Sequence, residues 1–185
     1  MKKLLVFLTL AALLAGCKEK TTVYRHGATA ICYDASVYRA EMKDEGTNLK
    51  MRLVNQQDST EWIFIGKRFY PELKELQDEL TQNARDEDEI RGDILDFTGM
   101  DLIYYRESIL EQVEAEFMEV DDIDPNHYEK GESGKYEGLR DGVQVYGYFI
   151  FALLEGGYEF ILQGESTDEA SRNRISELYP PSAFQ

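Results

Sequence analysis

Basic residues are few in this chain compared with acidic ones. Lysine and arginine number 20 against 36 aspartates and glutamates, so the formal net charge is −16. Nucleic-acid binding depends on lysine and arginine to neutralise phosphates, and anionic lipid head groups repel the same acidic excess. We therefore expect no nucleic-acid partner. The acidity favours a cationic partner or divalent ions, and net charge alone does not distinguish between the two.

Residues that often carry catalysis are also scarce. The histidines are His26 and His127, and the cysteines are Cys17 and Cys32. Neither histidine has the neighbours of a serine-hydrolase elbow, a zinc site or a phosphate-binding glycine loop. Carboxylates are too numerous for a hydrolytic pair to be located or excluded. We assign no catalytic residue and no cofactor.

Apolar runs long enough to span a membrane are absent; residues 4–14 form an apolar run that follows Lys2 and Lys3. The run is about half of the roughly 20 residues that a membrane-spanning helix needs. A basic start, a short apolar stretch and small residues form a secretory signal. We therefore expect an exported protein.

The signal ends in Leu14-Ala15-Gly16-Cys17. This sequence resembles the bacterial lipobox, whose cysteine is acylated and becomes the first residue of the mature protein. The resemblance implies a signal peptide of residues 1–16 and palmitate on Cys17 as the link to the membrane. Lys18 follows, where an aspartate would favour inner-membrane retention, so the resemblance implies the outer membrane, facing the periplasm. An ordinary signal peptide cleaved elsewhere is the alternative.

The mature chain has a formal charge of −18, because Lys2 and Lys3 are lost. Residues 17–27 are interpreted as the lipidated cysteine and a short tether of at most roughly 30 Å. Residues 28–185 have the length of one domain. With Cys17 acylated, no intramolecular disulfide is possible, and we expect Cys32 to be a buried thiol.

Period-two and period-3.6 patterns divide the first half of the domain. Strands are predicted at residues 28–33, 37–42, 49–54 and 62–65, and the last is apolar on both faces, as in a strand covered on two sides. Two helices follow. One opens at Pro71 and weakens near Gly92, and the other runs from Leu102 to Phe117.

The second half returns to strands. Asp141-Gly142 predicts a hairpin between residues 135–139 and 143–154. The latter run is apolar on both faces and is predicted to be the central strand, with Gly147 as a bulge or a close backbone approach.

A turn at Gly156-Gly157 leads to a strand at residues 158–162, and Ser166-Thr167-Asp168-Glu169 predicts a helix that ends at Pro180. Short turns imply antiparallel pairing, and strands that are apolar on two faces need helices to cover them. The predicted fold is therefore α+β: a single domain in which an antiparallel sheet is flanked by helices as a layered sandwich.

Residues 146–158 (YGYFIFALLEGGY), the capped helix after them and Ser182-Ala183-Phe184 are similar to the closing strands, helix and tail of the PsbP/DcrB-like superfamily. The resemblance implies an antiparallel sheet flanked by helices. Because this superfamily has no common chemistry, it also implies a non-enzymatic docking or assembly protein, with no residue roles to transfer.

Asp122-x-Asp124-x-Asn126 matches the first ligand positions of a calcium loop. The match fails later, where His127 replaces the turn glycine and Ser133 the bidentate glutamate. We predict a solvated acidic loop and assign no metal ligand.

The sequence therefore predicts an envelope lipoprotein that acts as a non-enzymatic binding or assembly module, with an envelope protein as its possible partner. The alternative is a divalent-cation or small-ligand binding protein that uses the acidic 121–127 loop, and the third reading is an envelope hydrolase. Tyrosine is frequent in the chain, which leaves open a carbohydrate- or protein-binding face.

Overall fold

The computed structural model describes residues 21–27, 29–123 and 131–180. In these ranges the elements are, in order, β1 (Thr22–His26), β2 (Thr29–Tyr33), β3 (Tyr38–Glu45), β4 (Asn48–Asn55), β5 (Trp62–Phe69), α2 (Pro71–Gln82), α3 (Glu87–Val113), β6 (Ala115–Ile123), β7 (Gly131–Arg140), β8 (Val143–Leu154), β9 (Tyr158–Ser166) and α4 (Glu169–Leu178).

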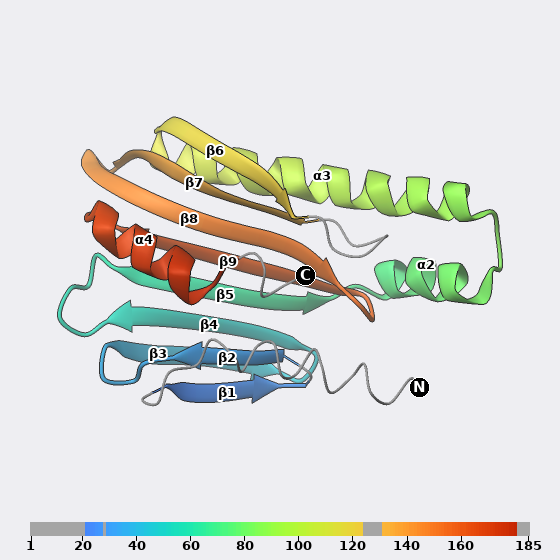
Figure 1. Cartoon of the computed structure of the whole chain (residues 1–185), viewed down its shortest axis with the longest axis horizontal. Helices are drawn as coiled ribbons and strands as arrows, with labels where there is room; N and C mark the ends of the chain where they lie inside the picture. The colour runs from blue at the N-terminus through green and yellow to red at the C-terminus, as the bar shows by residue number, and fades with distance from the viewer. Residues whose placement is uncertain (1–20, 28, 124–130, 181–185) are drawn as a thin grey trace.

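Seven antiparallel strands form one sheet in the order β3-β4-β5-β9-β8-β7-β6, and β1 pairs with β2 in a separate hairpin (Figure 1). This arrangement confirms the predicted α+β fold with an antiparallel sheet flanked by helices. The central strand is β9, however, and not residues 143–154 as predicted. Residues 143–154 form β8, which is still largely buried because helices pack on both sides of the sheet there.

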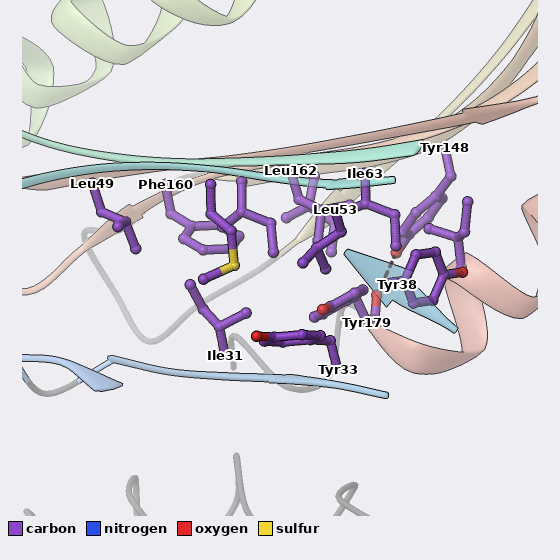
Figure 2. Close-up of a cluster of buried hydrophobic side chains, with 14 of the residues drawn as sticks. Ile31, Tyr33, Tyr38, Leu49, Leu53, Ile63, Tyr148, Phe160, Leu162 and Tyr179 are labelled. Atoms are coloured by element: carbon purple, nitrogen blue, oxygen red, sulfur yellow. Dashed lines mark hydrogen bonds between the residues drawn. The ribbon is translucent and has the colours of Figure 1, made fainter. Parts of the chain in front are cut away.

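One face of the sheet is covered by α4 and by the β1–β2 hairpin. Figure 2 shows Leu49 and Phe160 pointing from the sheet towards Ile31 and Tyr33 of β2, with Tyr179 at the end of α4 closing the cluster. Alternation along each strand places one set of side chains on this face. This cluster forms the larger part of the hydrophobic core.

On the other face, α3 packs over β6, β7 and β8, and α2 lies beside α3 near the turn between β8 and β9 (Figure 1). Leu73 of α2 and Ile90 of α3 meet Phe151 and Leu153 of β8. The backbone N–H of Gly157 donates to the side chain of Gln77 at 2.8 Å, which holds α2 at the turn between β8 and β9.

Helix α3 is longer than predicted and begins earlier. The Asp86 side chain accepts hydrogen bonds from the backbone of Asp88 and Glu89, so the helix starts at Glu87 and continues through Gly92. Burial of Ile90 and Ile94 against β8 outweighs the helical cost of the glycine, which is about 1 kcal/mol.

The end of α3 was also predicted wrongly. The helix stops at Val113, and Glu114 adopts a left-handed conformation with φ 38°. The chain then enters β6, so Phe117 belongs to a strand that the helical periodicity did not reveal. Residues 115–123 form a strand rather than more helix because pairing of β6 with β7 supplies their backbone hydrogen bonds.

The N-terminal boundary of the folded part differs as well. Thr22–His26 lie in the segment interpreted as tether, but they form β1 and pair with β2. At the other end, Asp168 caps α4 by accepting from the backbone of Ala170 and Ser171. Among the described helices, none has the length and apolar character that a membrane span requires.

Candidate binding surface

The face of the sheet that carries α2 and α3 is open over β3, β4 and β5. Along β4, Met51 and Leu53 are buried on the α4 side, whereas Lys50 and Arg52 are exposed on the opposite side. On β5, Trp62 and Phe64 are only half-buried on this same side. The prediction that residues 62–65 are covered on both faces is therefore only half correct.

Basic side chains are concentrated on this open side. We call the surface formed by these three strands the basic face; its lysines and arginines are Arg39, Lys43, Lys50, Arg52 and Arg68. The acidic residues Glu41 and Glu45 each pair with a neighbour on β3, Glu41 with Arg39 at 2.7 Å and Glu45 with Lys43.

Three of these cations have no carboxylate partner within 4.0 Å in the part of the chain that the structure describes: Lys50, Arg52 and Arg68. A net positive surface in a chain with a formal charge of −16 is unexpected from composition. The local excess of basic side chains favours an anionic partner.

Aromatic rings lie between the cations. The guanidinium carbon of Arg52 is 5.6 Å from the centre of the Trp62 ring, and that of Arg68 is 4.7 Å from the centre of the Tyr70 ring. Phe64 lies beside Gly66, where an added Cβ would be 3.2 Å from Cε1 of the ring. The rings thus form part of the floor, with positive groups over or next to them.

An open hollow of about 310 Å³ lies at the β3–β4 side of the basic face. Its lining includes Lys43, Lys50, Arg52 and Phe64 together with Glu41 and the two methionines Met42 and Met51. Met51 and its cross-strand partner Met42 lie on the α4 side of the sheet, so Phe64 is the apolar side chain on the open side of this hollow. Charged groups around one aromatic ring suit a ligand that has anionic groups and an apolar side.

A second hollow, also of about 310 Å³, lies between α4 and the strands β6, β7 and β8. Its charged lining residues are Glu119, Asp121 and Lys135, and its neutral ones include Ser133 and Tyr148. Burial, and after it the field of Asp121, raises the pKa of Tyr148, so this hydroxyl stays protonated and donates to the Tyr179 carbonyl at 3.0 Å. We call this the polar hollow.

The calcium-like motif begins next to the polar hollow. The backbone of Asp122 belongs to β6, whereas Asp124, Asn126 and His127 lie outside the described residues. Within the described ranges, no group of three or more His, Cys, Asp or Glu side chains is placed to hold a metal ion.

His26, the other histidine, is buried at the end of β1. Its Nε2 atom is 3.5 Å from the Asp44 carboxylate, which also accepts a 2.6 Å hydrogen bond from the Tyr24 hydroxyl. These contacts attach the β1–β2 hairpin to β3.

Cys32 is buried, as predicted, but it is disulfide-bonded, and the expectation of a thiol is wrong. The chain has one other cysteine, Cys17, which lies outside the described residues. One sulfur atom cannot carry both a diacylglyceryl thioether and a disulfide. Acylation of Cys17 would therefore exclude Cys17 as the disulfide partner of Cys32.

Sequence reasoning missed a buried carboxylate on β9. Glu165 accepts hydrogen bonds from the Tyr136 hydroxyl at 2.6 Å, from Arg140 at 2.7 and 2.8 Å, and from Gln163 at 3.2 Å. These donors occupy both carboxylate oxygens. Glu165 is thus a structural ion-pair partner whose oxygens are already engaged.

A second buried carboxylate joins α4 to the sheet. Glu61 is almost fully buried, and it accepts hydrogen bonds from the Tyr38 hydroxyl and, at 3.2 Å, from Arg174 of α4. No sequence signal marks either carboxylate, because their tyrosine and arginine partners lie 23 to 113 residues away.

Comparisons with known proteins add little. No family model and no curated protein matches the chain. A crystal structure of a Pseudomonas aeruginosa protein of unknown function is similar to it over 84% of this chain and 90% of that one, at 10% sequence identity and a TM-score of 0.35. A likeness at that level supports no conclusion about function.

Proposed function

We propose that this protein is a lipid-anchored, non-enzymatic binding module of the cell envelope, and that the basic face is its binding surface. The observation that carries the binding role is the concentration of lysine and arginine side chains around Trp62 and Phe64, in excess of Glu41 and Glu45, on strands that no described helix covers. Exposed patches of aromatic and arginine side chains are typical of interaction surfaces.

The proposed localisation in the cell envelope depends on the N-terminal sequence. Lys2 and Lys3, the apolar run and Cys17 after small residues support export and acylation. The N-terminal strand β1 begins at Thr22, so few residues would separate the lipid from the folded domain. A tether of this length keeps the folded domain near the membrane, at its periplasmic side.

The lipid anchor and the membrane localisation are tested by replacing Cys17. We expect the parent protein to incorporate radiolabelled palmitate and to fractionate with outer membranes. The Cys17→Ser variant should incorporate no label and should leave the membrane fraction. Equal fractionation of the two proteins would refute the lipid anchor. A Cys32→Ser variant is the matched control, because it removes a cysteine without touching the signal and should still be labelled.

A second candidate function is small-ligand binding in the polar hollow. The specific observation is that Glu119 and Asp121 face the same hollow as Lys135, so that a small cationic or zwitterionic ligand would find opposite charges there. Calcium is the simplest probe. We expect calorimetric titration of the protein to show no saturable heat at millimolar calcium. A clear midpoint that Asp121→Asn abolishes would favour this candidate instead.

A further inference from the structure

We propose that the basic face binds an anionic polysaccharide whose sugar rings carry carboxylate groups. This inference rests on the proposed function for the choice of surface and for the compartment in which such a polymer would be met. Binding itself is a property of the folded protein and does not depend on the lipid.

The cations of the basic face are spaced along a strand and across two strands. Lys50 and Arg52 are adjacent in the register of β4, where they face Gly66 and Phe64 of β5, and Arg68 lies further along β5. The cations therefore lie along and across neighbouring strands, where spacings are about 5 Å between strands and 7 Å between alternate residues. A polymer with one carboxylate on each sugar ring can contact several of them at once.

The aromatic rings of the basic face offer a stacking surface for a sugar. A sugar ring has an apolar face of C–H groups and a polar edge, and it can stack on an indole or phenyl ring while its carboxylate reaches a neighbouring cation. Trp62 beneath Arg52, and Phe64 beside Lys50, offer this combination. Interleaving of rings and charges is less suited to an amphipathic helix, which needs one continuous apolar stripe.

Shape argues against a lipid bilayer as the ligand. Helix α3 lies on the same side of the sheet as the basic face (Figure 1), and a helix rises about 10 Å above the strands that it covers. A planar membrane would meet the helix before the floor of the basic face. A flexible chain can lie beside α3 along the open strands.

Trp62 makes the proposal directly measurable, because it is the only tryptophan in the chain. The acylated protein, purified in a non-ionic detergent, is titrated with alginate, a polymer of uronic acids, and Trp62 emission is recorded. We expect a saturable change that weakens as salt is raised, because ion pairs contribute to binding. Dextran, a neutral polysaccharide, should produce no change.

Variants define the site. The double change Lys50→Ala and Arg52→Ala should weaken alginate binding about tenfold or more, which corresponds to about 1.4 kcal/mol. Arg91→Ala removes an arginine on α3 that pairs with Glu87, outside the basic face, and should leave binding unchanged. Equal thermal unfolding midpoints of the three proteins would show that the folded state is intact.

Several outcomes would overturn the proposal. An unchanged Trp62 signal at saturating alginate excludes the polysaccharide. Equal binding of polyglutamate shows a general preference for anionic polymers, which favours an acidic protein as the partner. If Cys17 proves not to be acylated but alginate still binds, the proposed lipid anchor is wrong and the proposed polysaccharide binding stands. If acylation is found and alginate does not bind, only this inference fails.

Discussion

The ring of Tyr136 on β7 lies directly over the backbone of Gly147 on β8. The two residues are cross-strand partners, and Gly147 is in turn the partner of Glu165 on β9, to which the Tyr136 hydroxyl donates at 2.6 Å. The same register continues to Trp62 on β5. One row of residues thus connects the strands beneath α3 to the basic face.

Gly147→Ala should destabilise the protein. A Cβ at this position would lie 2.0 Å from Cζ of Tyr136, so either the ring or the strand must move. Overpacking of this kind costs about 1–3 kcal/mol, and here the moving ring would also strain its bond to Glu165. The free energy of unfolding in urea measures the loss.

Gly92→Ala is the matched control for that change. Gly92 lies inside α3, and nothing is within 4 Å of the place where its Cβ would be. Alanine is a better helix former, so this variant should gain up to about 1 kcal/mol. If both glycine variants changed stability by the same amount and sign, the close approach of Tyr136 to Gly147 would not be the cause.

Local signals predicted the turns of this fold better than its long elements. Asp141 and Gly142 have φ values of 53° and 78°, as the hairpin prediction requires. Gly147 was predicted to be a bulge or a close backbone approach; the register through it is continuous, and what approaches it closely is the ring of Tyr136. Both features depend on residues next to one another in sequence or on the absence of a side chain, so a sequence pattern can reveal them.

The long elements depend on distant partners. Gly92 made the helical pattern look interrupted, and only the contacts of Ile90 and Ile94 with β8, some 60 residues later, show why α3 continues. The basic face was missed for a related reason. Alternation around Lys50 and Arg52 was visible in the sequence, but which strands adjoin β4, and whether a helix covers them, is decided by topology.

The ion pair between Arg140 and Glu165 should be strongly coupled. Glu165 raises the pKa of Arg140 through hydrogen bonds, and the carboxylate itself is almost fully buried. Arg140→Met leaves that charge without its main partner and should cost about 3–5 kcal/mol. Glu165→Gln keeps an acceptor for the Tyr136 hydroxyl and should cost less, about 1–3 kcal/mol.

The double variant provides the control for this pair. Combining Arg140→Met with Glu165→Gln removes both charges, so it should be less destabilised than the sum of the single variants. Urea unfolding of all four proteins completes the cycle. Strict additivity would show that the two side chains do not stabilise each other.

Lys67 should make stability depend on pH. Burial lowers the pKa of this amine, which lies 4.0 Å from the centre of the Tyr158 ring. The unfolded chain therefore binds the proton more tightly, and the charged amine opposes folding at pH values below the lowered pKa. This penalty fades as pH rises through the folded pKa towards the ordinary lysine value.

Lys67→Met should accordingly unfold at a higher temperature than the parent at neutral pH, and its advantage should shrink as the pH is raised. Lys50→Met, on the exposed basic face, is the matched control for replacing a lysine by methionine without removing a buried amine. A lower unfolding temperature of Lys67→Met at neutral pH would mean that attraction between the amine and the Tyr158 ring exceeds the cost of burying the charge.

Cys32 should report whether Cys17 is acylated. In the acylated protein the Cys17 sulfur is not available to Cys32, so denatured membrane-extracted protein should gain the mass of one alkylating group on Cys32 without prior reduction. Protein that escapes acylation in the oxidising compartment should instead gain none until it is reduced, as expected for the disulfide-bonded Cys32 of the structure. Intact-mass measurement before and after reduction separates the two states. Because acyl and disulfide chemistry compete for one sulfur atom, a membrane-extracted protein that is both acylated at Cys17 and resistant to alkylation at Cys32 would require another partner for Cys32, a second chain or a small thiol.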